Sequence, residues 1–136
     1  MQAAMARAAH TYYQTHVQSQ SPVELVVLLY DGMLRFMRVA AEAIERNDLA
    51  AKGAAVSRAL AIVSELQSSL NTQQGKDVAA GLDGLYTYVT GRLTDANVRN
   101  DSAPVHESIR LMTPLREAWA TIASPALHRG GSEERS

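Results

Sequence analysis

The chain has 136 residues and a formal net charge of −1, and its lysine and arginine residues are scattered along the sequence. Without a basic run or a basic helix face, neither nucleic acid nor an anionic membrane is an expected partner. The absence of cysteine excludes disulfides, thiolate metal sites and a cysteine nucleophile. A chain of this length is expected to form one domain that buries about two-thirds of its unfolded surface.

Residues 1–20 precede the first strong helix signal. Residues 1–11 are rich in alanine and form at most a marginal helix on their own. They hold a lone Arg7 and no apolar stretch, so we expect no secretory signal and a cytoplasmic protein. Residues 12–20 are polar except for three large side chains that could anchor the segment on an apolar surface. These anchors are Tyr12, Tyr13 and Val17.

The strongest helix signal opens residues 22–46. Ser21 is an N-cap residue, Pro22 suits the first helical position, and Glu24 follows the cap by three residues. On a helical projection the charged side chains share one stripe about 80° wide, and apolar side chains fill most of the rest. Such a helix is either the centre of a bundle or a site where a partner binds. Its longest apolar run, residues 25–30, is too short to cross a membrane.

Three more helices of similar length follow. Asp48 can cap a helix over residues 49–70, and a turn-rich stretch separates it from a third helix over residues 77–99. Residues 100–102 cap a fourth helix, which continues to about residue 123. Short connections make sequential helices antiparallel. The predicted fold is therefore all-α, an antiparallel up-down four-helix bundle.

Three regions make up the predicted domain organisation. Residues 1–20 form an N-terminal segment, and residues 21–123 form the helical bundle domain. Residues 124–136 combine a proline, a glycine pair and mixed charges, so we expect a disordered tail.

Two features of the third and fourth helices depart from ordinary helix sequences. Gly81, Gly84 and Gly91 lie inside the third helix, where a glycine costs about 0.5–1 kcal/mol relative to alanine. They indicate either close packing between helices or room for a bound peptide. Pro114 removes the hydrogen bond to the carbonyl of Arg110, and it is expected to kink or break the fourth helix.

The second and third helices carry more apolar residues than a simple bundle needs. The core stripe of the second helix comprises Val56, Ala59, Leu60, Val63, Gln67 and Leu70. A second line, about 80–100° away, comprises Ala51, Ala55, Ile62, Leu66 and Ser69. The core stripe of the third helix comprises Val78, Leu82, Leu85, Tyr86, Val89, Leu93 and Ala96, with Tyr88 about 110° from its centre. These flanks indicate either an apolar groove or a surface that a terminal segment covers.

The two kinds of position predict different effects of substitution. Changes at the flank residues Leu66 and Tyr88 should spare the fold, whereas an aspartate at Val63 or Val89 should unfold it. Asp31 also allows two interpretations. It forms either a surface pair with Arg35 on the same helix or a buried contact with Arg92 between helices.

Catalysis and metal binding have little support in the sequence. The histidines lie mostly near the termini, and none has a carboxylate at ligand spacing on a helix; they are His10, His16, His106 and His128. The Glu-x-x-His and His-Glu-x-x-His metal signatures are absent, as is a glycine-rich phosphate loop before a helix. We therefore predict no enzyme activity, no metal and no cofactor.

Several strings together resemble one known family, the FliS-type flagellar export chaperones. One of them is Leu-Tyr-Asp-Gly-Met-Leu at residues 29–34. Each string is weak alone, but five occur in the family's order and spacing between about residues 10 and 123. The matching stretches are residues 12–34, 64–71, 82–89, 92–101 and 116–119. Pro114 departs from the family pattern, in which this part of the last helix usually carries a helix-forming residue.

The resemblance implies a cytoplasmic chaperone of bacterial flagellum biogenesis and type III secretion. It would bind the disordered C-terminal segment of flagellin and prevent polymerisation before export, with the flagellar export gate as a further partner. We expect a monomer, with a homodimer as the alternative state. A bundle of this type could instead be an adaptor or regulator that binds a different protein.

The resemblance also suggests which residues bind the partner. The expected partner-binding residues are Ile62, Leu66, Leu70, Leu85, Tyr88, Val89 and Asn97. The family's N-terminal segment is thought to cover part of the groove when no client is bound. On this interpretation Tyr12, Tyr13 and Val17 anchor a lid.

Overall fold

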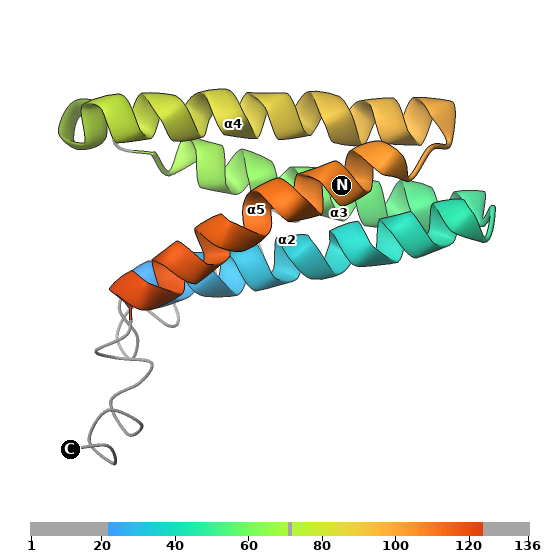
Figure 1. Ribbon diagram of the computed structural model, residues 1–136, viewed down its shortest axis with the longest axis horizontal. Coiled ribbons are helices and arrows are strands. Elements are labelled where there is room, and N and C mark those ends of the chain that lie inside the picture. The colour runs from blue at the N-terminus through green and yellow to red at the C-terminus, as the bar shows by residue number, and fades with distance from the viewer. Residues whose placement is uncertain (1–21, 71, 124–136) are drawn as a thin grey trace, which may run out of the picture.

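The computed structural model describes residues 22–70 and 72–123, and for residues 72–74 it describes the backbone only. This part of the chain forms four helices, α2 (Pro22–Glu45), α3 (Leu49–Ser68), α4 (Thr72–Arg99) and α5 (Ala103–Ile122). Figure 1 shows them packed together with sequential helices antiparallel. The predicted all-α class and the four antiparallel helices are confirmed.

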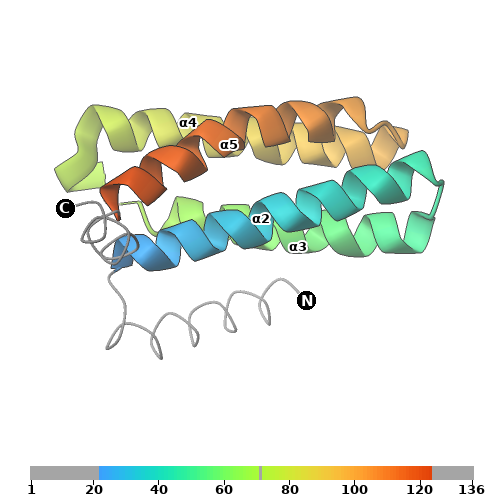
Figure 2. The same ribbon diagram turned by 60° about the horizontal axis from the view of Figure 1, so that its bottom comes forward.

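The helices pack in a ring of four contacts. α2 packs against α3 and α5, and α4 packs against the same two helices, so α2 and α4 lie diagonally across the bundle. α5 crosses obliquely, since it begins beside the end of α4 and ends beside the start of α2 (Figures 1 and 2). At one end of the bundle α5 therefore lies beside α4, and at the other end it lies beside α2.

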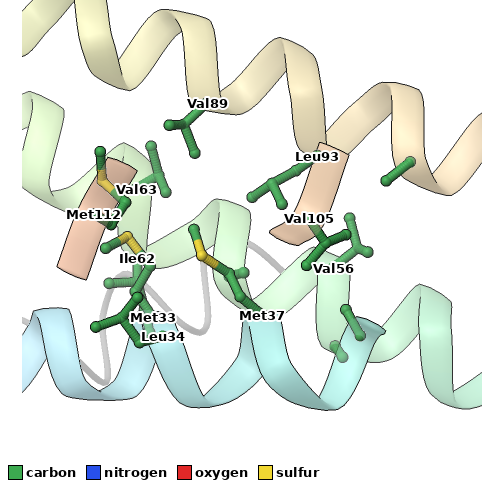
Figure 3. Close-up of a cluster of buried hydrophobic side chains, with 14 of the residues drawn as sticks. Met33, Leu34, Met37, Val56, Ile62, Val63, Val89, Leu93, Val105 and Met112 are labelled. Atoms are coloured by element: carbon green, nitrogen blue, oxygen red, sulfur yellow. The ribbon is translucent and has the colours of Figure 1, made fainter. Parts of the chain in front are cut away.

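The core runs along the axis of the bundle. α2 buries ten of its 24 residues, more than the third of a helix surface that an ordinary amphipathic helix covers. Large apolar side chains from all four helices meet in the centre, including Met33, Met37, Leu93, Val105 and Met112 (Figure 3). The prediction that α2 needs apolar neighbours on most sides therefore agrees with its burial.

Two asparagines terminate helices at the same end of the bundle. Asn47 follows α2 and Asn100 follows α4, with positive φ angles of 59° and 53°. After each asparagine, the next amide donates to a carbonyl five residues earlier, that of Ala43 or Ala96. This is the Schellman pattern of helix termination, in which asparagine tolerates the left-handed conformation. The Asn100 side-chain amide donates to the Asn47 side chain at 3.0 Å, which joins the two turns.

Other polar contacts close this end, which we call the closed end. Glu45 Oε2 contacts the Ser102 hydroxyl at 3.0 Å and the His106 ring at 2.9 Å, and these bonds lower the pKa of Glu45. The buried Lys52 side chain donates to the carbonyl of Asn97 at 3.0 Å. A cation at the last turn of a helix also interacts favourably with the helix dipole.

The predicted helix starts are largely confirmed. The Asp48 side chain caps α3 by accepting the amide of Ala51 at 3.1 Å. At the start of α5, Asp101 accepts the amide of Ala103 at 3.0 Å, while the Ser102 hydroxyl makes no such cap bond. Ser21, the predicted cap of the first helix, lies outside the described residues.

The predicted start of the third helix at residue 77 agrees with the regular part of α4, but a helical turn precedes it. α4 begins at Thr72 and has a kink at Lys76, where φ is 40° and ψ is −107°, so residues 72–75 form a separate first turn. A Cβ on Gly75 would lie 3.0 Å from the Cβ of Ala79. The small size of Gly75 thus permits a helical turn in a stretch whose composition indicated a loop.

Pro114 does not break α5, contrary to one outcome expected from the sequence. The helix continues through it to Ile122. The proline lacks the amide hydrogen that would bond to the Arg110 carbonyl. However, its ring is exposed while Met112 is fully buried against the core, so packing holds the helix together. A bend at this position stays a prediction.

The structure excludes one of the two interpretations of the α4 glycines and one of the two interpretations of Asp31. Nothing lies within 4 Å of a Cβ built on Gly81, Gly84 or Gly91, so close helix packing does not explain these glycines. Asp31 pairs with Arg116 of α5 at 2.8 Å. The buried contact between Asp31 and an α4 arginine is therefore wrong.

Candidate binding pocket

A pocket of about 360 Å³ lies at the end of the bundle opposite the closed end. We call this the open end, where α2 begins, α3 ends, α4 begins and α5 ends (left in Figure 1). All four helices contribute to its wall. The lining residues are Val26, Leu66, Ser69, Leu70, Gly75, Val78, Ala79, Leu82, Tyr86 and Trp119.

The oblique course of α5 creates this pocket. The first half of α5 is tied to α4, because Arg92 and Tyr88 both bond to Glu107. The last turn of α5 packs instead on α2, where Ala120 is buried against Val27. The first turns of α4 therefore lack cover from α5, and one of their apolar side chains, Val78, is 69% exposed.

The pocket wall is apolar and partly accessible. Among the described residues that line it, none carries a charge. Of the lining residues, Leu66 and Tyr86 are buried, whereas Leu70, Leu82 and Trp119 are half-buried and keep part of their surface free. Pockets of a few hundred Å³ with mostly apolar walls are typical binding sites. This one suits an apolar side chain of a partner.

One of the lining residues, Tyr86, is bonded to a second buried tyrosine, Tyr30, which does not line the pocket. The hydroxyls of Tyr30 and Tyr86 are 2.5 Å apart and share a hydrogen bond. Burial raises the pKa of Tyr30 and raises that of Tyr86 further, because its bond to Tyr30 adds to the effect of burial. Both hydroxyls are therefore neutral donors and acceptors at physiological pH.

A charged cluster on the surface joins α4 to α5. Glu107 accepts the Tyr88 hydroxyl at 2.8 Å and Nε of Arg92 at 2.6 Å. The hydrogen bond from Tyr88 lowers the pKa of Glu107 most, and the bond from Arg92 lowers it further. The bond to Glu107 likewise raises the pKa of Tyr88. These bonds hold the first half of α5 against α4.

The structure brings only two of the seven predicted partner-binding residues into the pocket wall, Leu66 and Leu70. Ile62 and Val89 belong to the main core (Figure 3). Leu85 is half-buried against that core.

The other two predicted partner-binding residues lie away from the pocket. Tyr88 is 47% exposed on α4, and Asn97 lies at the closed end, where its carbonyl accepts Lys52. The predicted lid residues Tyr12, Tyr13 and Val17 lie outside the described residues.

Three helix positions were assigned to the wrong surface. Ile62 and Leu66 were expected on an outer flank, but they are 8% and 2% exposed because α2 packs over that side of α3. Val78 was expected in the core and is exposed, because α5 diverges from α4 there. A projection of one helix cannot show where its neighbours lie.

Val26 and Trp119 line the pocket, although neither is among the residues predicted to bind a partner. Trp119 carried a signal, since it is the only tryptophan and stands in one of the matching strings. Gln67, assigned to the core stripe, instead bonds to the side chains of Asp83 and Thr87 and ties α3 to α4.

A four-helix bundle with an apolar pocket at one end defines a class of helical protein-binding modules. Comparison with known proteins narrows this class, because the family model described as "Flagellar protein FliS" matches residues 5–126. The chain belongs to the FliS family. This confirms the resemblance drawn from the sequence, and it agrees with the prediction of a binding protein that is not an enzyme.

Curated relatives support the same assignment. The chain is 36% identical over 122 residues to the flagellar secretion chaperone FliS of Bacillus subtilis, covering 89% of this chain and 90% of the relative. It is 34% identical over 119 residues to the protein of the same name from Salmonella typhimurium, covering 87% and 88%. In the described part of the chain, none of the helices has the length and apolar character needed to cross a membrane.

Proposed function

We propose that this chain is a flagellar secretion chaperone that binds the disordered C-terminal segment of flagellin. It prevents premature polymerisation and supports flagellin export. The observation that supports this most strongly is an apolar pocket at the open end of a bundle that belongs to the FliS family. A chaperone needs such a surface to hold the apolar side chains of its client.

The pocket wall suits a client that is disordered when free and helical when bound. Leu70, Leu82 and Trp119 keep apolar surface that a partner can bury. The client loses conformational entropy when it folds, and wide apolar contact offsets that loss. Because the pocket alone is small, the client must also contact the outside of α4.

The proposed binding surface therefore begins at the pocket and continues along α4. We place Leu66 and Leu70 at the pocket, and Leu85, Tyr88 and Asn97 successively further along α4. Ile62 and Val89 support this surface from the core. The outer face of α4 also carries Gly81, Gly84 and Gly91, where a client backbone can approach because no side chain intervenes.

The cellular setting is part of the same proposal. The chaperone acts in the cytoplasm as a monomer that binds one flagellin, and the flagellar export gate receives the client. The runner-up function is an adaptor or regulator that uses the same bundle for a different protein.

Calorimetry with the flagellin of the source organism separates these functions. Full-length flagellin and its isolated C-terminal segment should bind with the same one-to-one stoichiometry, whereas flagellin that lacks the segment should give no heat. Binding of the truncated flagellin would favour the adaptor. If none of the three flagellin forms gave binding heat, the flagellin chaperone would be rejected.

We also propose that residues 1–20 act as a lid anchored by Tyr12, Tyr13 and Val17. A lid that competes with the client lowers the apparent affinity by the fraction of open molecules. Deletion of residues 1–17 removes all three anchors, and it should tighten binding of the flagellin segment in calorimetry. If the deletion abolishes binding while the melting temperature is retained, the segment is part of the site and not a lid.

A further inference from the structure

One ion pair ties the second half of α5 to α2. Arg116 of α5 donates to Asp31 of α2 through two nitrogens, with Nε 2.8 Å from Oδ1 and Nη2 3.3 Å from Oδ2. The third guanidinium nitrogen, Nη1, lies 3.2 Å from Oε1 of Glu117. A two-point contact between a planar guanidinium and a carboxylate sets an orientation as well as a distance. The pair therefore holds α5 at a defined rotation against α2.

The two halves of α5 are tied to different helices. Before Pro114, Glu107 accepts bonds from Tyr88 and Arg92 of α4. Two residues after Pro114, Arg116 bonds to α2. The proline removes one backbone hydrogen bond between these ties, and a helix bends most readily where such a bond is missing. The second half of α5 can therefore change its position while the first half stays on α4.

Trp119 lies one turn beyond Arg116 and forms part of the pocket wall. Residues three positions apart are neighbours on one side of a helix, so the rotation set by Arg116 also sets the direction of the indole ring. The buried part of the apolar contact between this half of α5 and α2 consists of Val27, Ala120 and Ala123. Alanine methyl groups make few contacts and fix the rotation of a helix less firmly than a two-point ion pair. The position of this pocket wall thus depends on the ion pair.

The uncovered start of α4 offers the second half of α5 another place to pack. Val78 is 69% exposed, and it lines the pocket together with the half-buried Leu82. Removal of such apolar surface from water is favourable. Without its tie to α2, this half of α5 would move toward α4, and Trp119 would close onto Val78 and Leu82. The ion pair opposes this collapse.

We propose that Asp31 and Arg116 form a positioning pair that keeps the pocket open for the client. The pair holds Trp119 on the α2 side of the pocket, so the flagellin segment meets an apolar site that is already formed. This inference rests on the proposed function and adds two positioning residues to it. When part of the molecules is closed, the apparent affinity falls to the fraction that stays open.

Variants that remove the pair should affect binding more than stability. The side chains of Arg116 and Asp31 are 29% and 46% exposed, and ion pairs this exposed add little to stability. The test uses Arg116→Gln, Asp31→Asn and the double variant, all in the full-length chain. Glu45→Gln is the matched control, because it removes an equally exposed contact, that with His106, at the closed end. All four proteins should melt close to the wild-type temperature.

Acrylamide quenching of fluorescence reports whether the pocket has closed, because Trp119 is the only tryptophan of the chain. In the free proteins, both single variants should be quenched less than wild type, since the closed pocket covers the ring. In calorimetry, both should bind the flagellin C-terminal segment about two- to fivefold more weakly. The double variant should match either single variant, because the two residues act as one unit. Glu45→Gln should match wild type in both measurements.

Wild-type quenching together with wild-type affinity in Arg116→Gln would overturn the positioning role and leave the chaperone function intact. An equal loss of affinity in Glu45→Gln would overturn it too, because the effect would then not be specific to the pocket. If wild type does not bind the flagellin segment, the proposed function fails. Quenching of the free proteins then decides the positioning role alone, with reduced quenching in Arg116→Gln supporting it and unchanged quenching rejecting it.

Discussion

At the scale of single residues, burial and partner binding overlap at the pocket. Leu66 lines the pocket and is also part of the main core, with 2% of its surface exposed. Tyr88 lies on the outside of α4 and reaches the rest of the protein through its bond to Glu107. The two residues therefore differ in what they contribute to stability, although both were expected on dispensable flanks.

Substitutions at these two residues should separate the two roles. Leu66→Asp places an unpaired charge in the core and should destabilise the bundle by on the order of 4 kcal/mol or more. Tyr88→Ala removes one solvent-exposed hydrogen bond, so it should lower the melting temperature far less than Leu66→Asp does. Thermal melting followed by circular dichroism measures both, with Val63→Asp as a core control. Similar melting temperatures for the Leu66 and Tyr88 variants would contradict the observed burial.

Glu107 should make stability depend on pH. Its bonds to Tyr88 and Arg92 lower its pKa in the folded state, so its contribution is present above the unfolded pKa and is lost as pH falls through the folded pKa. Between about pH 6 and about pH 3, the melting temperature of wild type should therefore fall more than that of Glu107→Gln. Parallel pH curves for the two proteins would show that the cluster has no net effect.

At the scale of elements, the course of α5 determines whether the bundle has a pocket at one end. Its start is held on α4 by the Glu107 cluster, and its end packs on α2 through Ala120 and Ala123. Pro114 lies between these two regions, at the point where one backbone hydrogen bond is missing. The divergence of α5 from α4 opens the pocket, so the course of this helix links local sequence to the site.

Replacing the proline should strengthen α5 without removing the bundle. Pro114→Ala restores the amide that can bond to the Arg110 carbonyl, and a proline in a regular helix interior costs about 3 kcal/mol. We expect a higher melting temperature with unchanged helical content, by an amount up to that cost. A lower melting temperature would mean that the proline fits a bend on which the packing depends.

At the scale of the whole molecule, one end of the bundle is fixed and the other is open. Polar bonds among the loops, such as that between Asn47 and Asn100, tie the closed end together. The pocket at the open end has an apolar wall with half-buried side chains. A rigid closed end can hold the helices in place while the open end binds a client.

Much of this architecture could be predicted from the sequence, because its signals are local. Asp48 and the residues before α5 mark helix starts, and the apolar period of α2 indicates a helix with neighbours on most sides. The site was less predictable because it depends on where neighbouring helices lie. The same apolar pattern predicts Leu66 outside and Val78 inside, but α2 covers the side of α3 that carries Leu66, and the oblique course of α5 leaves Val78 exposed.

The central claim is that the flagellin segment occupies the pocket at the open end. Trp119 is the only tryptophan of the chain and lines that pocket, so its fluorescence reports on occupancy when the flagellin C-terminal segment used contains no tryptophan. Titration with this segment should shift the emission to shorter wavelength and saturate at one segment per chaperone. Binding heat in calorimetry without any change in Trp119 emission would contradict the account, because the client would then bind elsewhere.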